Sequence, residues 1–209
     1  MPVRFEQSPT PQLFQTDAFE FGDNRAFKTF QGMDISNDTI LTTQEDYAWD
    51  GFSRADNAAQ DVDFDFTINT PLVLEGDAIL TFTFSVLKLG SSSTSVPYKI
   101  TSNLIHFDGT TETVLATRNF ADATTLNTGE GFHRIVSFKL PVAKTKFNPG
   151  DIVRLNIVFD DITQGGQNLA TFIYHDPKNR TFDTGTGGGG GNTTTSKMEL
   201  TLPINTNYI

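Results

Sequence analysis

Two segments of the chain alternate apolar and polar residues with a period of two, and this alternation limits the fold more than any other feature. In the segment 62–68, every second residue is Val, Phe or Ile, and the residues between them are Asp or Thr. The segment 79–87 repeats the pattern, with Phe82, Phe84 and Val86 separated by threonine or serine. Successive side chains of a β-strand point to opposite faces of its sheet, so each segment predicts a strand with one buried face and one face in water.

Further strands are predicted along the rest of the chain. They span residues 96–107, 112–117, 132–140, 152–159, 169–175 and 198–204. Turns or loops separate the strands, at Glu75-Gly76-Asp77, Asp108-Gly109, 119–131 and Asn148-Pro149-Gly150-Asp151. Within one of these strands, Arg134 interrupts an otherwise apolar face. About eight short strands without a convincing helix are typical of an all-β fold, a two-sheet antiparallel β-sandwich of the jelly-roll type.

The chain is expected to begin with an extended N-terminal arm, residues 1–46, followed by the sandwich domain, residues 47–209. Phenylalanine recurs in the arm without a period of two or 3.6, whereas disordered segments are depleted in aromatic residues. We therefore predict that the arm docks its rings into grooves, either on its own sandwich or on a neighbouring subunit. The residues assigned to this interface are Phe5, Phe14, Phe19 and Phe21. An equally weighted interpretation places one or two early strands of the sandwich in this block, for example Ala26–Gln31 and Thr39–Thr43.

Charge and residue usage argue against several kinds of partner. The 209-residue chain has a formal net charge of −10, and its 15 Lys and Arg residues are scattered singly. Nucleic-acid surfaces need clustered basic residues, so we expect neither nucleic acid nor an anionic membrane as a partner. The absence of cysteine excludes disulfides and thiolate chemistry. No stretch resembles a signal peptide or a membrane span, so we expect synthesis in the cytoplasm of a host cell.

No group of residues in the sequence specifies a reaction. His106, His133 and His175 fall on three predicted strands and lack the spacing of metal ligands. No Gly-x-Ser-x-Gly motif marks a serine nucleophile. We therefore predict that the chain is not an enzyme and holds neither a metal nor another cofactor, which makes a metal-dependent β-fold enzyme the weakest of our hypotheses.

Three carboxylates also alternate along the strand predicted at 62–68 and the residue just before it. Asp61, Asp63 and Asp65 share one face of that strand. Aligned carboxylates can bind Ca²⁺, which takes several oxygen ligands. The interpretation that we favour is a solvated strand face.

Two further motifs are candidates for contact with a ligand or a subunit. Tyr47 and Trp49 lie among acidic residues, as in a platform for stacking sugars, although we favour Trp49 as an anchor between arm and sandwich. Lys178 and Arg180 follow a strand in a predicted turn, where they either contact a neighbouring subunit or simply end the strand. The glycine run in segment 184–196 leaves the backbone maximally free, so this segment is predicted to be a flexible surface loop.

Two short segments carry a resemblance to a known group of proteins. The run 147–155, Phe-Asn-Pro-Gly-Asp-Ile-Val-Arg-Leu, and the run 172–177, Phe-Ile-Tyr-His-Asp-Pro, resemble tailed-phage virion proteins with jelly-roll folds. This group includes capsid decoration (cement) proteins and related head appendages. The resemblance extends over residues 62–204 in the order of predicted strands and turns, and it is found in the amino-acid sequence only within these two segments. It implies trimers or similar assemblies on the capsid surface, with arms that bridge capsomers, and it brings no catalytic residues.

The function predicted from these observations is that of a structural virion protein. It would decorate or cement the outside of a phage capsid through self-association and arm contacts, as a homo-oligomer, with a trimer favoured, bound to the major capsid protein. Its location would be the capsid surface of the virion. The alternative, from a different class, is a carbohydrate- or receptor-binding β-sandwich module that uses Tyr47, Trp49 and nearby acids.

Overall fold

A computed structural model describes ten stretches of the chain, and the structural statements below refer to them. The stretches are residues 25–35, 38–43, 51–56, 59–89, 94–127, 129–160, 169–175, 180–183, 193–196 and 198–206.

Nearly all described residues belong to β-strands. The strands are β1 (Arg25–Ile35), β2 (Asp38–Thr42), β3 (Gly51–Asp56), β4 (Gln60–Thr67), β5 (Leu72–Lys88), β6 (Thr94–Phe107), β7 (Glu112–Leu126), β8 (Gly131–Phe147), β9 (Ile152–Asp160), β10 (Leu169–His175), β11 (Arg180–Asp183), β12 (Thr193–Ser196) and β13 (Met198–Asn205). No helix in the described stretches has the length and apolar character needed to span a bilayer.

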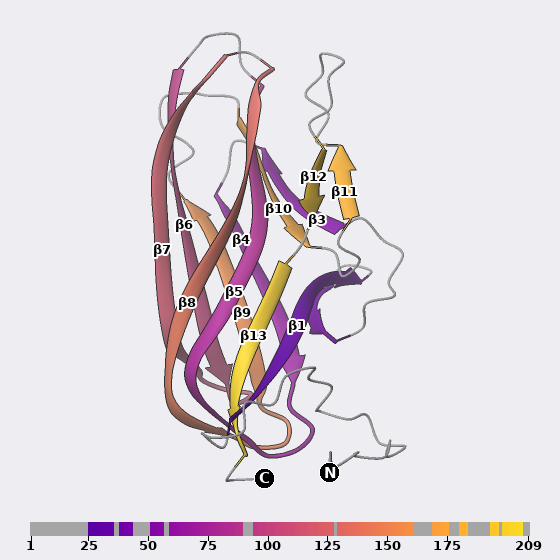
Figure 1. Ribbon diagram of the computed structural model, residues 1–209, viewed down its shortest axis with the longest axis vertical. Coiled ribbons are helices and arrows are strands. Elements are labelled where there is room, and N and C mark those ends of the chain that lie inside the picture. Colours follow the sequence, from indigo (N-terminus) through magenta and orange to yellow (C-terminus); the bar gives the residue numbers. More distant parts are fainter. Residues whose placement is uncertain are drawn as a thin grey trace, which may run out of the picture.

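The large sheet curls on itself into two facing layers (Figure 1). Its strand order is β3-β10-β5-β13-β1-β2-β4-β9-β6-β7, and β8 pairs with the other edge of β5. One layer contains β8, β5, β13, β1, β10 and β3, and the other contains β2, β4, β9, β6 and β7. The antiparallel pairing of β1 with β2 joins the layers, and among the described strands the one parallel contact is Ile40 opposite Asp65 between β2 and β4. The predicted all-β sandwich of jelly-roll type is confirmed.

The early strands belong to the sheet and not to an arm. β1 pairs with β13 along Arg25–Gln31 and with β2 along Gln31–Ile35. For these residues the structure follows the interpretation that placed early strands in the first block. Residues 1–24 and 44–50 lie outside the described stretches, so a boundary between arm and sandwich remains a prediction.

Three strands run further than the sequence pattern indicated. β5 passes straight through the predicted turn at Glu75-Gly76-Asp77, where a register shift and a φ of +120° at Gly76 mark a β-bulge. β7 continues to Leu126, through a segment predicted to be a loop. β8 continues past Leu140 to Phe147 and includes Pro141, which is tolerated because β8 has a partner on one side only.

Phenylalanine fills the space between the layers. Phe82, Phe84 and Val86 of β5 are completely buried, as the alternation predicted. The ring of Phe84 lies 5.6 Å from that of Phe159 on β9 and 5.7 Å from that of Tyr98 on β6, so it packs against the opposite layer. Such aromatic pairs add to the area that they bury. The interior is therefore a single aromatic and aliphatic core shared by both layers.

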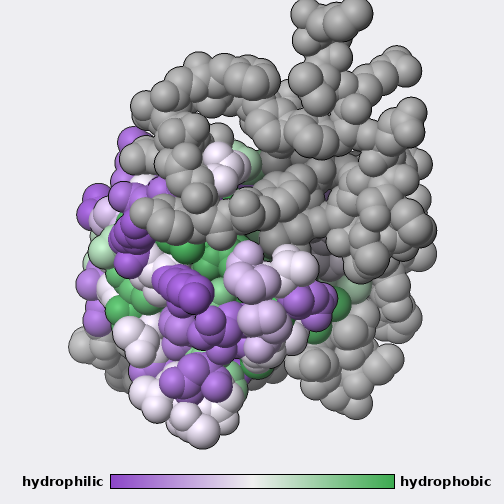
Figure 2. Space-filling model, turned by 90° about the horizontal axis from the view of Figure 1, so that it is seen from below, coloured by the Kyte–Doolittle hydropathy of each residue, from purple (hydrophilic) through white to green (hydrophobic). Residues whose placement is uncertain are grey.

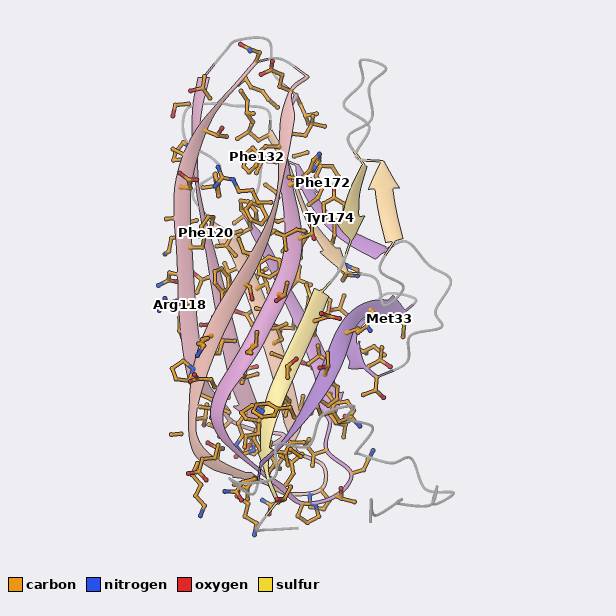
Figure 3. All side chains as sticks on the ribbon, in the orientation of Figure 1. Met33, Arg118, Phe120, Phe132, Phe172 and Tyr174 are labelled. Carbon is orange, nitrogen blue, oxygen red and sulfur yellow. The ribbon has the colours of Figure 1, made fainter. Side chains whose placement is uncertain are left out.

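The outer face of β5 is also buried in its upper part. Thr83 and Ser85 were predicted to face water, but they are 0% and 3% exposed. The Ser85 hydroxyl lies 2.8 Å from the hydroxyl of Tyr174 on the neighbouring strand β10. The Tyr174 ring stacks with that of Phe172 at 6.1 Å, and Figure 3 labels both side chains on β10. The prediction was wrong here because a polar strand face becomes buried when side chains of a neighbouring strand cover it.

Candidate functional site: an aromatic seam between two edge strands

The sandwich is open along one side, between β7 and β8. In the described chain β7 pairs only with β6 and β8 only with β5, so each strand has one edge without a ladder partner. Figure 1 shows these two long strands running beside each other along one side of the molecule. An edge strand presents unpaired backbone N–H and C=O groups and is a common place for another chain to bind.

Strand register places three phenylalanines on the inner faces of these edge strands. Phe120 of β7 lies opposite Ile100, while Phe132 and Phe138 of β8 lie opposite Val86 and Leu80. All three partners are completely buried, but the phenylalanines themselves remain partly exposed. The reason is geometric, because among the described strands none lies beyond β7 or β8 to cover them. We call Phe120, Phe132 and Phe138, with Tyr98 beneath them, the aromatic seam.

The rings of the seam contact one another and the core. Phe132 lies 5.1 Å from Tyr98, and Phe120 lies 6.1 Å from Tyr98 and 6.3 Å from Phe138. Phe84 of the core lies within 6.3 Å of both Phe120 and Phe132. Figure 3 labels Phe120 and Phe132 on their two strands. The seam is therefore the exposed margin of the core and not a separate cluster.

A charged pair bridges the seam. Asp122 of β7 and Arg134 of β8 occupy inner-face positions, and the Arg134 guanidinium donates to the Asp122 carboxylate at 2.6 Å. Arg134 also lies over the Phe132 ring at 5.6 Å, and the Tyr98 hydroxyl donates to Asp122 at 3.3 Å. This arrangement explains why Arg134 interrupts the apolar face of its strand. Both partners are about two-fifths exposed, so the bridge contributes little stability and can be displaced.

The pKa shifts around this bridge have clear causes. The backbone N–H of Ala123 lowers the pKa of Asp122, and the charge of Arg134 lowers it further. Burial raises the pKa of Tyr98 to about 12. Asp122 is therefore ionised and Tyr98 protonated at neutral pH, so the carboxylate accepts from both neighbours.

The two edge strands are basic in an acidic protein. β7 and β8 carry five basic side chains against two acidic ones, whereas the whole chain has a formal net charge of −10. The basic residues are Arg118, Arg134, Lys139, Lys144 and Lys146, and the acidic ones are Glu112 and Asp122. Arg118 and Arg134 lie on the inner face beside the seam, whereas Lys139 lies on the outer face; Arg134 pairs with Asp122, and Lys139 pairs with Asp77.

The outer face of the β4–β9–β6–β7 layer contains a second polar arrangement, which we call the polar ladder. The Asn156 amide donates to Asp63 at 2.8 Å and to Asp61 at 2.6 Å, and the Asn103 amide donates to Asn156 at 2.9 Å. The Thr117 hydroxyl then donates to Asn103 at 2.8 Å. One chain of hydrogen bonds therefore crosses four strands.

Arg154 of β9 neutralises much of the acidity of the ladder. Its guanidinium donates two bonds of 2.8 Å to the carboxylate of Asp65, lies 3.3 Å from Asp63 and also donates to Glu112. The hydrogen bonds to Asp65 are the main cause that raises the pKa of Arg154. Asp61, Asp63 and Asp65 do share a face, as predicted, but Arg154 and Asn156 occupy their carboxylates.

One histidine contacts a carboxylate at the lower end of the sandwich. His106 Nε2 lies 2.8 Å from the Asp151 carboxylate, which also accepts the backbone N–H of Asn148 at 2.8 Å. The Asn148 bond is the main cause that lowers the pKa of Asp151, and His106 contributes. The contact ties the turn before β9 to β6, with Gly150 at a φ of +95° as the turn prediction required. Figure 2 views this end from below, where hydrophilic residues cover much of the described surface.

The other two histidines lie apart from this contact. His175 of β10 is 0% exposed and meets the Phe64 ring edge-on at 5.2 Å, and burial lowers its pKa to about 4. Burial also lowers the pKa of His133 on β8. In the described stretches no group of three or more His, Cys, Asp and Glu residues could hold a metal ion.

Most of the predicted site residues fall outside the described stretches. These are Phe5, Phe14, Phe19, Phe21, Tyr47, Trp49 and Lys178. Arg180 opens β11, where its backbone lies opposite Ser196. The roles of these residues therefore remain predictions. Sequence reasoning missed the seam because Phe120 lies in a segment predicted to be a loop, and Phe132 and Phe138 were read as ordinary core. The signal that was available was the charge at position 134 on an apolar strand face, which is typical of protected edge strands.

Comparison by sequence and by structure gives different results. No protein-family model matches the chain, and no curated protein is similar to it in sequence. A CocE/NonD family hydrolase from Staphylococcus aureus matches with a TM-score of 0.51 and 13% identity over 87% of this chain. An aminopeptidase from a marine sediment archaeon, Thaumarchaeota archaeon, matches with a TM-score of 0.54 and 8% identity, again over 87% of this chain. The match covers 37% of each of those chains, so this chain spans little more than a third of their length.

These matches correct one prediction. The chain was predicted not to be an enzyme, but the similar structures named above are hydrolases, so that prediction is contradicted. At these identities the likeness shows the fold alone, a β-sandwich that also occurs within hydrolases. The VP2 subviral particle of infectious bursal disease virus matches with a TM-score of 0.35 and 14% identity, covering 87% of this chain and 40% of that one. A TM-score this low does not establish a shared fold.

Proposed function

We propose that the chain is a structural β-sandwich protein on the outside of a virus particle, which works by contact between copies and with a capsid, in the manner of a phage capsid decoration protein. The observation that supports self-association is the aromatic seam, where three inner-face phenylalanines stay partly exposed between two edge strands. The virion location is supported by the resemblance of residues 147–155 and 172–177 to jelly-roll virion proteins.

The physical reason to expect self-association is that the seam exposes apolar rings and unpaired backbone groups. Partly exposed aromatic rings and unpaired strand edges both gain free energy when a second protein covers them. Strand edges that only face water would not be expected to carry three partly exposed phenylalanine rings, as β7 and β8 together do. The N-terminal phenylalanines supply rings that a subunit contact would bury, and the four assigned to the interface all precede β1, which begins at Arg25.

The proposal is tested by deleting the N-terminal residues that precede β1 while leaving every described strand intact. A variant that lacks residues 1–24 keeps all of β1, and its mass in solution is compared with that of the full chain by analytical ultracentrifugation. Binding of both proteins to purified capsids of the virus whose genome encodes the chain is measured by co-sedimentation. We expect the deletion to lower both the assembly mass and capsid binding.

A matched pair of variants shows whether the phenylalanines are responsible. In the test variant, the four arm phenylalanines 5, 14, 19 and 21 are changed to serine. In the control, Gln7, Gln12 and Gln15 are changed to serine. We expect loss of assembly in the first variant only. Unchanged assembly and capsid attachment after deletion of residues 1–24 would remove the proposal.

A second candidate, hydrolysis, is favoured by the fold match to hydrolases. The described residue best suited to act as a base is His106, because Asp151 holds its ring at 2.8 Å. The test is turnover of nitrophenyl esters and aminoacyl nitroanilides by the full chain and by His106→Ala. Equal rates for the two proteins would exclude a role for this histidine, and no turnover by either would exclude the activity on these substrates.

A further inference from the structure

We propose that the aromatic seam is the receptor for residues 1–24 of a second copy of this chain, whose phenylalanines lie against Phe120, Phe132 and Phe138. This inference rests on the proposed function, because it names the surface through which the copies associate.

The first argument is the chemistry of the two surfaces. Around Phe19 and Phe21, the arm carries Asp17, Glu20 and Asp23, and Arg4 is its one basic residue. The seam is lined by aromatic rings, and the inner faces of its two strands carry Arg118 and Arg134 against one acidic side chain, Asp122. Rings of the arm would thus meet rings of the seam, and its acidic residues would meet Arg118 and Arg134, in a protein whose overall charge repels other copies.

The second argument is that the seam can accept an extended segment. β7 and β8, which are 15 and 17 residues long, each have one edge without a ladder partner in the described stretches, and side chains approach each other across these edges where Arg134 meets Asp122. A strand added to either edge would project every second side chain toward the inner face of the sandwich. Phe19 and Phe21 have this spacing of two. The Asp122–Arg134 bridge is exposed enough to rearrange, and Arg134 can then pair with an acidic side chain of the arm.

The third argument concerns which copy supplies the arm. Residue 25 opens β1, which pairs with β13 and β2, while β8 lies beyond β13 and β5 in the sheet order. The chain's own arm would have to turn back across these strands to reach the seam, whereas an arm from a neighbour can enter from the open side. At up to ~3.3 Å per residue, a 24-residue segment spans at most about 80 Å, enough to reach a neighbouring molecule. One arm and one receptor per chain form a head-to-tail contact, which gives a ring when the rotation between copies closes and an open filament when it does not.

Disulfide trapping in the full-length protein tests the contact, because the chain has no cysteine of its own. Ala18→Cys or Gln15→Cys is introduced into the arm of one protein, and Thr124→Cys into a second. Position 124 lies on the inner face of β7, two residues from Asp122, and is partly exposed. The matched control is Thr67→Cys, an exposed threonine of β4 on the other side of the layer. The proteins are mixed under mild oxidation, and heterodimers are counted by mass.

We expect at least about tenfold more heterodimer with Thr124→Cys than with Thr67→Cys, because docking raises the effective concentration of the two thiols. Equal yields at the two positions from both arm cysteines would overturn the proposal. A double variant, Ala18→Cys with Thr124→Cys, shows which copy supplies the arm. If it yields only an internally bridged monomer, the second-copy proposal is wrong.

Charge reversal gives an independent readout. Arg118→Glu, at the exposed inner face of β7, is expected to weaken self-association about two- to fivefold, and Asp17→Arg in the arm is expected to restore it. Failure of the rescue, with association still weakened, would count against the pairing of arm and seam. If the full chain assembles but neither trapping nor rescue succeeds, this inference fails while the proposed function stands. If the full chain does not assemble, both fail.

Discussion

The polar ladder lies on the outer face of one layer and the aromatic seam lies between the edges of both layers, yet the first is complete and the second is open. In the ladder, each polar side chain from Asp63 to Thr117 finds a partner on the next strand. In the seam, Phe120 and Phe138 contact each other, but among the described strands β7 and β8 each have a ladder partner on one side only. Position in the sheet makes the difference, because a central strand has flanking side chains on both sides and an edge strand does not.

This contrast separates two uses of surface residues. Hydrogen bonds already formed within a protein gain little from a new partner, since binding must first break them. Partly exposed aromatic rings gain by being covered. We therefore assign the ladder to stability and the seam to binding, and the predictions below test that division.

The largest expected effect lies beneath the seam. Phe84→Ala removes a completely buried ring that contacts Phe120 and Phe132. We expect the free energy of unfolding to fall by about 3–5 kcal/mol, as for other buried phenylalanines. Urea denaturation measures it, with Val114→Ala, an exposed residue of β7, as the control. A loss of stability no larger than that of the control would show that the seam is not part of the core.

Acid is expected to weaken the interior, independently of the ladder and the seam. His175 is buried and its pKa is lowered from 6.5 to about 4, so the folded protein disfavours its charged form. The unfolded chain therefore binds the proton first, and stability is present above pH 6.5 and declines as the pH falls toward 4. The loss is of the order of 3 kcal/mol.

Denaturant titrations at several pH values measure this loss, and His175→Gln removes the titrating group. We expect a flatter stability profile between pH 6.5 and 4 in the variant. The same slope in both proteins would assign acid sensitivity to the carboxylates with lowered pKa, such as Asp151 and Asp122, instead of to His175.

The ladder is tested through its central cation. Arg154→Met removes the partner of Asp65, Asp63 and Glu112 and leaves three carboxylates close together. We expect a loss of about 2 kcal/mol, the scale of hydrogen bonds to charged groups, together with an unchanged assembly state. The control is Lys139→Met, whose exposed pair with Asp77 is expected to contribute at most about 0.5 kcal/mol. Loss of assembly in Arg154→Met would break the division between ladder and seam.

Substitution of a seam residue is expected to change the free energy of unfolding least but to weaken self-association clearly. Phe120→Ser removes a partly exposed ring, so we expect a loss of about 1 kcal/mol in unfolding free energy and weaker self-association. Stability by thermal denaturation and mass by ultracentrifugation are measured together, with Ala121→Ser on the exposed outer face as the control. Weaker folding with unchanged association would make Phe120 a core residue only.

The fold could be predicted well from the sequence, and the seam could not. Alternation placed Phe82, Phe84 and Val86 in the core, and the Asn148–Asp151 turn appears where Pro149 and Gly150 predicted it. The second half of β7 was missed because the inner face of an edge strand stays partly in water. Charged residues such as Arg118 and Asp122 can lie there without a large desolvation penalty, so the sequence pattern resembles that of a loop. Gly76 was read as a turn because glycine serves turns and bulges equally.

Local alternation by itself determined that this protein is a β-sandwich with a phenylalanine-rich interior, since side-chain direction in a strand depends only on neighbouring residues. Only the tertiary structure decided which strands are edges, that β1 closes the sheet and that Thr83 and Ser85 are covered. It also decided that Asp122 meets Arg134 across an aromatic margin. These properties depend on which strand lies beside which, and residues distant in sequence become neighbours only when the sheet curls.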